Sequence, residues 1–315
     1  MKLHNILLQL MQLVLVIASA PLLSGWVGQC RAWLSNRQGA GPLQPYRVLR
    51  RLFNKDPVIA HEASFLFRIT PYIVFGGMCL AGAIVPMFST GLPFAPVADA
   101  IALVGIFAFA RIFTALAAMD IGTAFGSMGA RREMLVGFLA EPALLMVLFT
   151  PALISHSTSL TVIVARLTTE KLVLYPSMAF AAAAYVMVLL AENARIPVDN
   201  PNTHLELTMI HGALNLEYSG RYLALIEWAS AIKLLTYITM GIALFVPWGI
   251  GRSGGWTHLP FTLTVFAIKV MAACFMLAFL ETLLAKMRLF RVPEFLGTAF
   301  MLAVVGLLVH FLLGA

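Results

Sequence analysis

Charged residues and cysteines are scarce in this chain. Only 11% of its 315 residues are Asp, Glu, Lys or Arg, whereas 61% are hydrophobic. Soluble domains carry about 25% charged residues. The three cysteines, Cys30, Cys79 and Cys274, are far apart and form no Cys-x-x-Cys pair. These shortages argue against a water-exposed domain, a disulfide framework and an iron–sulfur site held by this chain.

The sequence signals of other cofactor classes are also missing. No glycine-rich phosphate loop follows a strand-like run, which argues against nucleotide binding. The seven histidines are scattered, and only His310 falls clearly inside an apolar run, whereas a haem within the membrane needs paired ligands. We therefore expect no cofactor and no metal in this chain. The net charge of +7 does not indicate a nucleic-acid partner, because the basic residues lie between apolar runs.

Long apolar runs are what the sequence has in abundance. About 20 apolar residues cross the hydrocarbon core of a bilayer, and only helices or closed barrels satisfy the backbone there. The runs are too long for barrel strands. The sequence therefore predicts an all-α fold: a polytopic membrane protein with about eight transmembrane helices, forming a single membrane domain over residues 1–315. The predicted spans lie near 5–28, 66–89, 97–119, 134–156, 172–192, 222–248, 259–284 and 294–314.

Lysine and arginine are distributed unevenly between the connections. The loops after the first, third, fifth and seventh spans carry 14 of them, and the other connections carry four. Cytoplasmic loops are enriched in basic residues. The asymmetry therefore predicts that residues 30–65 are cytoplasmic and that both termini lie outside the cytoplasm.

Residues 43–54 combine an apolar face with a basic face. The apolar residues are Leu49, Leu52 and Phe53, and the basic ones are Arg47, Arg50 and Arg51. Helical spacing of this kind predicts an amphipathic helix that lies in the cytoplasmic interface. The alternative is an ordinary solvated linker.

Several ionisable residues fall inside or next to the predicted spans, where charge is costly. Glu141 is followed by Pro142, which has no N–H to donate to the carbonyl of Phe138 and so leaves a polar gap beside the carboxylate. We expect Glu141 either to be protonated or to pair with a base such as Arg111 or Lys233. Buried acids and bases can relay protons, or they can pair across helices and only fix the packing. The residues predicted to form a proton path are Arg111, Glu141, Glu192, Glu227 and Lys233.

The densest polar segment runs from Glu192 to Arg221. It lies on the predicted cytoplasmic face, yet it carries several acids that the topology does not require. Two prolines and a Tyr-Ser-Gly sequence indicate a shaped loop rather than a helix or a flexible linker. The segment is therefore predicted to dock a partner or to open a channel.

This segment resembles the subunit 1 family of respiratory complex I, together with the membrane subunits of group 4 nickel–iron hydrogenases such as formate hydrogenlyase and hydrogenase-4. The family pattern is Glu, then Arg-x-Pro-Phe-Asp, then spaced acids, then Glu-Tyr-Ser-Gly. The matching residues here are Glu192, Arg195, Pro197, Asp199, Glu206, Glu217, Tyr218, Ser219 and Gly220. A Gly-Pro-rich stretch at 37–45, and Arg131-Arg132 followed by Glu141, match as well, so the resemblance covers nearly the whole chain.

The sequence departs from the complex I pattern at a few positions. Asn202 and His204 stand where complex I members have acids, and Val198 replaces the usual Phe. The first loop also lacks the acid that those members have near Arg47. These departures favour the hydrogenase side of the family.

The resemblance implies a non-catalytic membrane anchor of an inner-membrane complex. Its partners would be soluble nickel–iron large and iron–sulfur small subunits and antiporter-like membrane subunits, with a proton path beginning at its buried acids. The residues implied in docking are Arg37, Arg131, Arg132, Arg195, Asp199, Glu206 and Glu217. The alternatives are a subunit that forms a quinone site in a complex I-like dehydrogenase, a stand-alone ion transporter, and a structural anchor whose charges only pair.

Overall fold

The computed structural model describes residues 2–60, 62–91, 93–94, 97–169, 176–199, 210–251, 259–285 and 287–312. Every named element within these ranges is a helix, which confirms the all-α prediction. The helices are α1 (Lys2–Leu34), α2 (Gln44–Phe53), α3 (Phe65–Ile84), α4 (Ala100–Asp120), α5 (Ala124–Ser155), α6 (Leu160–Leu167), α7 (Pro176–Glu192), α9 (His211–Leu214), α10 (Gly220–Phe245), α11 (Leu259–Leu283), the 3₁₀ helix η2 (Leu289–Arg291) and α12 (Val292–Leu312).

Each of the eight predicted spans corresponds to one helix. Among the described residues, seven helices are long and apolar enough to cross a membrane: α1, α3, α4, α5, α10, α11 and α12. The fifth predicted span corresponds to α7, which is apolar and has 17 described residues. The polytopic prediction is therefore confirmed.

The start of α5 differs from the prediction. The helix begins at Ala124, ten residues before the predicted span, so Arg131 and Arg132 are helical and not in a loop. The side chain of Thr123 accepts a hydrogen bond from the N–H of Gly126 and caps the helix. Hydrophobicity located the long apolar part of this helix but not its first ten residues, which include two glycines and the charged Arg131, Arg132 and Glu133.

Alternate connections gather at opposite ends of the molecule. At one end Ser64 donates its N–H to Asp120, and Met287 donates its N–H to the carbonyl of Pro197. At the other end isolated bridges join Ser89 to Gly251 and Asp99 to Ser159. The loops after the first, third, fifth and seventh spans, called here the odd-numbered loops, therefore share one face of the molecule. This face is called here the basic end, and its existence is what an up-and-down topology requires.

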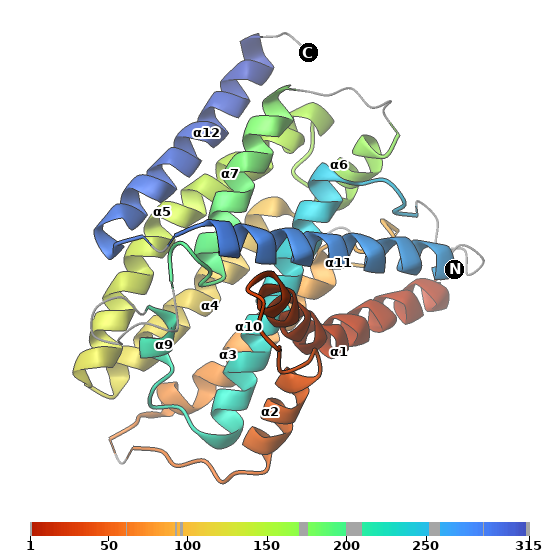
Figure 1. Cartoon of the computed structure of the whole chain (residues 1–315). Coiled ribbons are helices and arrows are strands. Elements are labelled where there is room, and N and C mark those ends of the chain that lie inside the picture. The colour runs from red at the N-terminus through yellow and green to blue at the C-terminus, as the bar shows by residue number, and fades with distance from the viewer. Residues whose placement is uncertain are drawn as a thin grey trace.

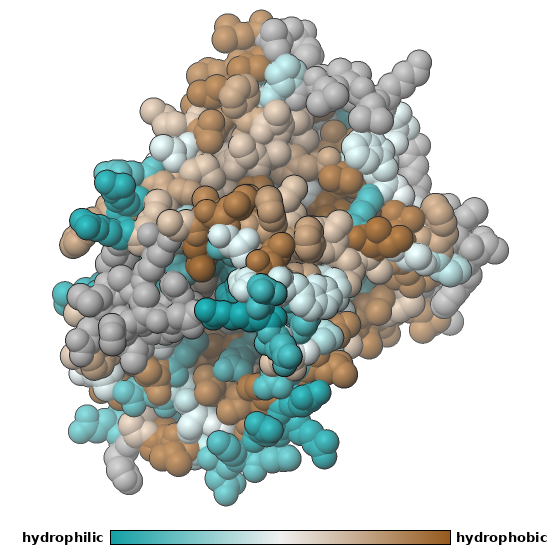
Figure 2. Space-filling model, viewed as in Figure 1, coloured by the Kyte–Doolittle hydropathy of each residue, from teal (hydrophilic) through white to brown (hydrophobic). Residues whose placement is uncertain are grey.

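The helices pack in three linked groups. Helix α12 packs on α5 and α7, α4 lies between α3 and α5, and α1 packs on α10 and α11. Figure 1 shows α1 and α11 running across the direction of α12 and α7. Figure 2 shows a hydrophobic surface over α12 and hydrophilic side chains gathered at the lower end of the view, around α2.

Helix α2 coincides with the predicted amphipathic segment, residues 43–54. Its Leu49 is buried, whereas Arg47, Arg50 and Arg51 are exposed. It packs on α1 and α10, where Phe53 meets the indole of Trp228 edge-on at a ring distance of 6.2 Å. The basic end of the molecule therefore carries a short helix with a row of three exposed guanidinium groups.

Candidate functional site

The centre of the site is a buried guanidinium bound by three carboxylates. Arg111, on α4, is only 6% exposed. Its Nε donates to Glu133 Oε1 at 3.2 Å, while Nη1 and Nη2 contact Glu141 and Glu192. Glu133 and Glu141 lie on α5, and Glu192 is the last residue of α7. The expected pairing of Glu141 with Arg111 is confirmed, and the ion pairs join three helices.

A glycine on α5 makes room for this guanidinium. Glu133, Gly137 and Glu141 are spaced four residues apart, so they lie on one face of the helix. A Cβ atom built at Gly137 would approach Arg111 Nη1 to 2.3 Å. Arg111 therefore lies across the gap that Gly137 leaves between the two acids.

A lysine from α10 completes the network. Lys233 Nζ lies 2.9 Å from Glu192 Oε2, and the same ammonium lies 6.0 Å from the ring centre of Tyr237. Glu192 thus contacts both Arg111 and Lys233 while being almost fully buried. A buried carboxylate is stabilised when it is paired and hydrogen-bonded, and Glu192 meets that condition from two helices.

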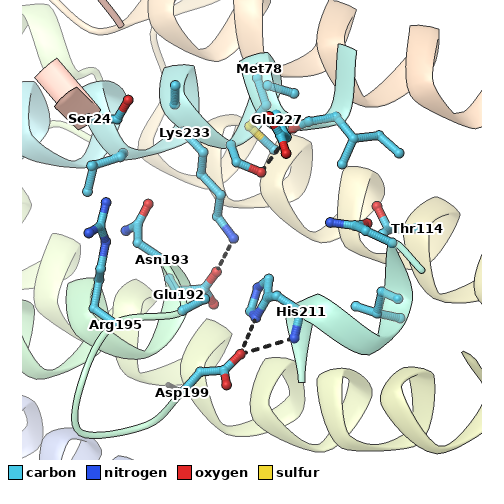
Figure 3. Close-up of a pocket in the computed structure, with 18 of the residues that line it drawn as sticks. Ser24, Met78, Thr114, Glu192, Asn193, Arg195, Asp199, His211, Glu227 and Lys233 are labelled. Carbon is cyan, nitrogen blue, oxygen red and sulfur yellow. Dashed lines mark hydrogen bonds and ion pairs between the residues drawn. The ribbon is translucent and has the colours of Figure 1, made fainter. Parts of the chain in front are cut away.

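A cavity of about 430 Å³ opens beside this network. Glu192, Lys233, Asp199 and His211 line it together with apolar residues of α3, α4 and α10 (Figure 3). Glu227, which was predicted on the proton path, also lines the cavity and is exposed to it. The structure therefore brings all the predicted proton-path residues to one cavity or into direct contact with its walls.

His211 links this network to the loop at the basic end. Its Nε2 lies 3.5 Å from Glu133 Oε2, and its Nδ1 lies 3.6 Å from Asp199 Oδ2. Burial lowers the pKa of His211, but the charge of Glu133 and the contact with Asp199 outweigh it, so the pKa lies above its ordinary value. Burial raises the pKa of Asp199, but His211 and the N–H groups of Ile210 and His211 outweigh it, so that pKa lies below its ordinary value.

A further buried acid, Glu281, lines the same cavity. Glu281, on α11, contacts Arg195 Nη1 at 3.2 Å and Arg31 Nη1 at 3.7 Å. Arg31 comes from the end of α1 and Arg195 from the loop after α7. Because Glu281 is buried, these pairs hold α1, α11 and the loop together.

The Tyr-Ser-Gly sequence joins two loops of the basic end. The ring of Tyr218 stacks on Phe67 at 4.0 Å, and its hydroxyl donates to the carbonyl of Phe67. The hydroxyl of Ser219 accepts from the N–H of Val58 and donates to its carbonyl. The loops after the first and fifth spans therefore form one continuous surface.

The predicted docking residues differ in their surroundings. Arg37, Arg131 and Glu217 are exposed at the basic end, and Arg132 is half-buried. Asp199 is buried and faces inward to His211, and Arg195 is held by Glu281. Glu206 lies outside the described residues. Docking stays a prediction for all of these residues, and the exposed ones are the better candidates.

Sequence reasoning missed three members of the site: Glu133, His211 and Glu281. Glu133 follows Arg131 and Arg132 and was assigned with them to a loop. Its spacing of eight residues from Glu141, with Gly137 midway, was the available signal. No local pattern marks His211 or Glu281, because their partners come from distant segments.

Comparison with known proteins decides the family. The family model described as NADH dehydrogenase matches residues 6–311. The chain belongs to this family. Within the NADH dehydrogenase family it is 32% identical to formate hydrogenlyase subunit 4 of Escherichia coli over 296 residues, which cover 94% of this chain and 95% of that protein. It is 31% identical over 301 residues to hydrogenase-4 component C of the same organism, covering 95% and 94%.

Two further proteins are similar to this chain in sequence or in fold. NADH-quinone oxidoreductase subunit 8 of Thermus thermophilus is 28% identical over 240 residues, covering 70% of this chain and 60% of that protein. A chain of the archaeal membrane-bound sulfane sulfur reductase, a respiratory membrane complex, superposes with a TM-score of 0.79 at 19% identity, covering 96% and 98%. This last likeness shows the fold alone. The predicted resemblance to the complex I subunit 1 family is confirmed.

Proposed function

We propose that this chain is the membrane anchor and proton-path subunit of a complex I-like, membrane-bound hydrogenase. It docks soluble nickel–iron and iron–sulfur subunits at its basic end and lies beside antiporter-like membrane subunits. The relatives of highest similarity named above are subunits of hydrogen-handling complexes, which supports this choice of complex. The chain spans an inner membrane with both termini outside the cytoplasm.

The observation that carries the proposal is the buried network around Arg111. Three carboxylates from α5 and α7 meet at one guanidinium beside a cavity, and Lys233 of α10 pairs with one of them, Glu192. Ionisable groups within a membrane are costly and mark ion pathways. Because Arg111 contacts Glu133, Glu141 and Glu192 together, a proton that binds to one of these acids changes the proton affinity of the others. A redox event at the basic end would reach this network through the loop that carries Asp199 and Arg195.

Replacement of Glu141 tests the proton path. Glu141→Gln keeps a hydrogen-bonding side chain beside Arg111 but cannot carry a proton, so the complex should assemble and lose coupled turnover. Glu141→Asp keeps a titratable group and should retain part of the coupled turnover. Hydrogen evolution and proton translocation are measured in membranes that contain the assembled complex. Glu294→Gln, at an exposed acid in the first turn of α12, is the control and should behave as wild type. Wild-type hydrogen evolution and proton translocation in Glu141→Gln would show that the buried acids have only a structural role.

A quinone-site subunit is the second candidate. The cavity has a volume within the range of ligand pockets, roughly 300–1,000 Å³, and its walls combine charged groups with Val74, Met78 and Phe107. Such walls suit a ring with polar edges. Quinone reduction by the purified complex separates the candidates, because a hydrogenase coupled without quinone gives no such activity.

A stand-alone transporter would work without partners. The lone chain, reconstituted in liposomes, should carry no current or proton flux under our proposal, because electron transfer in the partner subunits drives the change. Flux through the lone chain would favour the transporter.

A further inference from the structure

We propose that His211 passes protons between the basic end of the molecule and the buried carboxylate of Glu133. This inference rests on the proton path proposed above and assigns its inlet. The same cavity also has a wall of α10 that carries Glu227, so the inlet is a choice between two routes that experiment can distinguish.

The position of His211 is fixed by its contact with α5. A Cβ atom at Gly129 would lie 2.9 Å from the Cβ of Ala213 and 3.3 Å from the carbonyl oxygen of Ile210. The short helix α9 therefore rests directly on α5 at Gly129. Glu133 lies one turn further along the same face of α5, which places it against the imidazole.

The two ring nitrogens of His211 face two different carboxylates. Nδ1 faces Asp199 at 3.6 Å, and Nε2 faces Glu133 at 3.5 Å. The other oxygen of Glu133 accepts from Arg111, so the imidazole is one step from the central network. An imidazole gains and loses a proton at one nitrogen near neutral pH while the other nitrogen keeps its own hydrogen and stays beside its partner.

The exposure of these groups falls toward the interior. The His211 side chain is 30% exposed, whereas those of Asp199 and Glu133 are 5% and 6% exposed. Water at the basic end can therefore reach the imidazole while the two acids stay covered. Along the contacts from Asp199 through His211 and Glu133 to Arg111, the side chain of His211 is the most exposed.

The charges around the imidazole favour its protonated form on balance. Burial and Lys233 from α10 oppose protonation of the ring, whereas Glu133 from α5 and Asp199 from the loop favour it. The pKa of His211 lies above its ordinary value as a result. The ring therefore takes up a proton from solvent more readily than a free imidazole does.

Each transfer moves one proton through Nε2, while Asp199 stays beside the Nδ1–H of the ring. Hydronium at the basic end gives a proton to Nε2 and becomes water, which makes the ring an imidazolium. The Nε2–H bond then breaks, and the proton forms an O–H bond with Glu133 Oε2, so the ring and the carboxyl group both become neutral. The ring keeps its Nδ1 proton and accepts the next proton from hydronium at Nε2. No oxidant, reductant or further reactant takes part.

His211→Ala in the assembled complex tests this inlet. A positioned acid–base group contributes on the order of 10²–10⁴-fold to a proton transfer, and water can replace part of that, so we expect coupled turnover to fall at least about 10-fold. Added imidazole should restore most of it, because a small diffusible base can occupy the space left by the ring. A structural role would not give this rescue. His156→Asn is the control: His156 is exposed at the opposite end in a left-handed conformation that Asn tolerates, and turnover should not change.

His211→Gln serves if the Ala variant does not assemble. Glutamine keeps the volume and hydrogen bonds but does not titrate, so turnover should fall as it does for Ala and lose its dependence on pH near neutrality. Glu133→Gln and Glu141→Gln are measured alongside. Normal turnover in both His211 variants, with coupling lost in the Glu variants, would overturn the inlet and leave the proton path. Normal coupling in all of them would overturn the path itself.

Discussion

At the scale of single residues, the contact between Gly137 and Arg111 is a sensitive point of the central network. Arg111 has three acid partners, and its place among them depends on a missing side chain one turn from each acid of α5. Breaking a buried ion pair on one side costs about 3–5 kcal/mol. A single methyl group at Gly137 should therefore have an effect far larger than its size.

Gly137→Ala should lower the midpoint of thermal unfolding in detergent and reduce coupled turnover. The new Cβ would overlap Arg111 Nη1 and push the guanidinium away from Glu141. The control is Gly105→Ala on α4, where a Cβ meets nothing within 4 Å. There the exchange should stabilise the helix by up to about 1 kcal/mol. Equal midpoints for the two variants would contradict the tight fit.

The pair of Asp199 and His211 should make the loop after α7 sensitive to pH. The raised pKa of His211 means that its contribution is complete below about pH 6.5 and is lost as the pH rises through the raised value. The lowered pKa of Asp199 means that its contribution is complete above about pH 4 and is lost as the pH falls through the lowered value. The contact is therefore strongest between those two limits.

Hydrogen exchange of segments 193–199 and 210–215 should measure this dependence. After correction for intrinsic exchange, protection should fall as the pH rises from 6 to 9. Asp199→Asn should remove most of the change. Protection that rises with pH in the unaltered chain would show that the signs of these shifts are wrong.

The sequence predicted the charged groups better than their partners. Arg111, Glu141, Glu192 and Lys233 stand out because a charge inside an apolar run has an evident cost. Glu133 lies just before the predicted span 134–156, and His211 and Glu281 lie near helix ends, so their charge looks ordinary in the sequence. Only the folded chain shows that they are covered or in contact with the network. Burial depends on distant segments, so it left no local pattern in the sequence.

At the scale of elements, the loops of the basic end are held by specific bonds. Tyr218 and Ser219 fix the first loop against the start of α10. Glu281 fixes the loop after α7. The long apolar runs located most of the spans within a few residues, but they contained no information on these cross-links. They also placed the start of α5 too late, because Arg131, Arg132 and Glu133 interrupt the apolar run inside that helix.

Arg195 is a poor probe of docking because it is paired with Glu281 inside the chain. Its exchange for an acid would set two carboxylates against each other at Glu281 and would disturb the loop without any partner. Exposed residues give a cleaner test. Arg131→Glu combined with Glu217→Arg should release the soluble subunits from membranes during fractionation, because complementary charges fix the register of an interface.

Thr169→Glu is the matched control for this release. Thr169 is exposed at the opposite end of the molecule, and its exchange should leave the soluble subunits bound. Full retention in the double variant, with normal turnover, would show that these two residues do not contact the soluble arm.

At the scale of the whole molecule, the two ends differ in charge and in the contacts that join their loops. The odd-numbered loops gather at one end with most of the Lys and Arg. The other end is tied by the bridges at Ser89 and Asp99. The up-and-down order was predictable from hydrophobicity and basic residues, since both are properties of single segments. The crossing of α1 and α11 over the remaining helices was not, because it depends on how side chains of distant segments fit.

Labelling of single cysteines should establish the orientation. In a background with Cys30, Cys79 and Cys274 replaced by Ala, Ser35→Cys should react only from the cytoplasmic side and Thr169→Cys only from the other. The 14-to-4 distribution of basic residues gives this sidedness. Reaction of both positions from one side would refute the topology.

The network around Arg111 also bears on the net charge of the cavity beside it. The ionisable side chains that line this cavity are the acids Glu133, Glu192, Asp199, Glu227 and Glu281 and the bases Arg31, Arg111, Arg195, Lys233 and His211. With these groups ionised, the wall is balanced when His211 is protonated and carries one extra negative charge when His211 is neutral. A low-dielectric cavity with an excess of one sign focuses its field on ions of the opposite sign. Loss of the proton from His211 would therefore make the cavity attract cations more strongly.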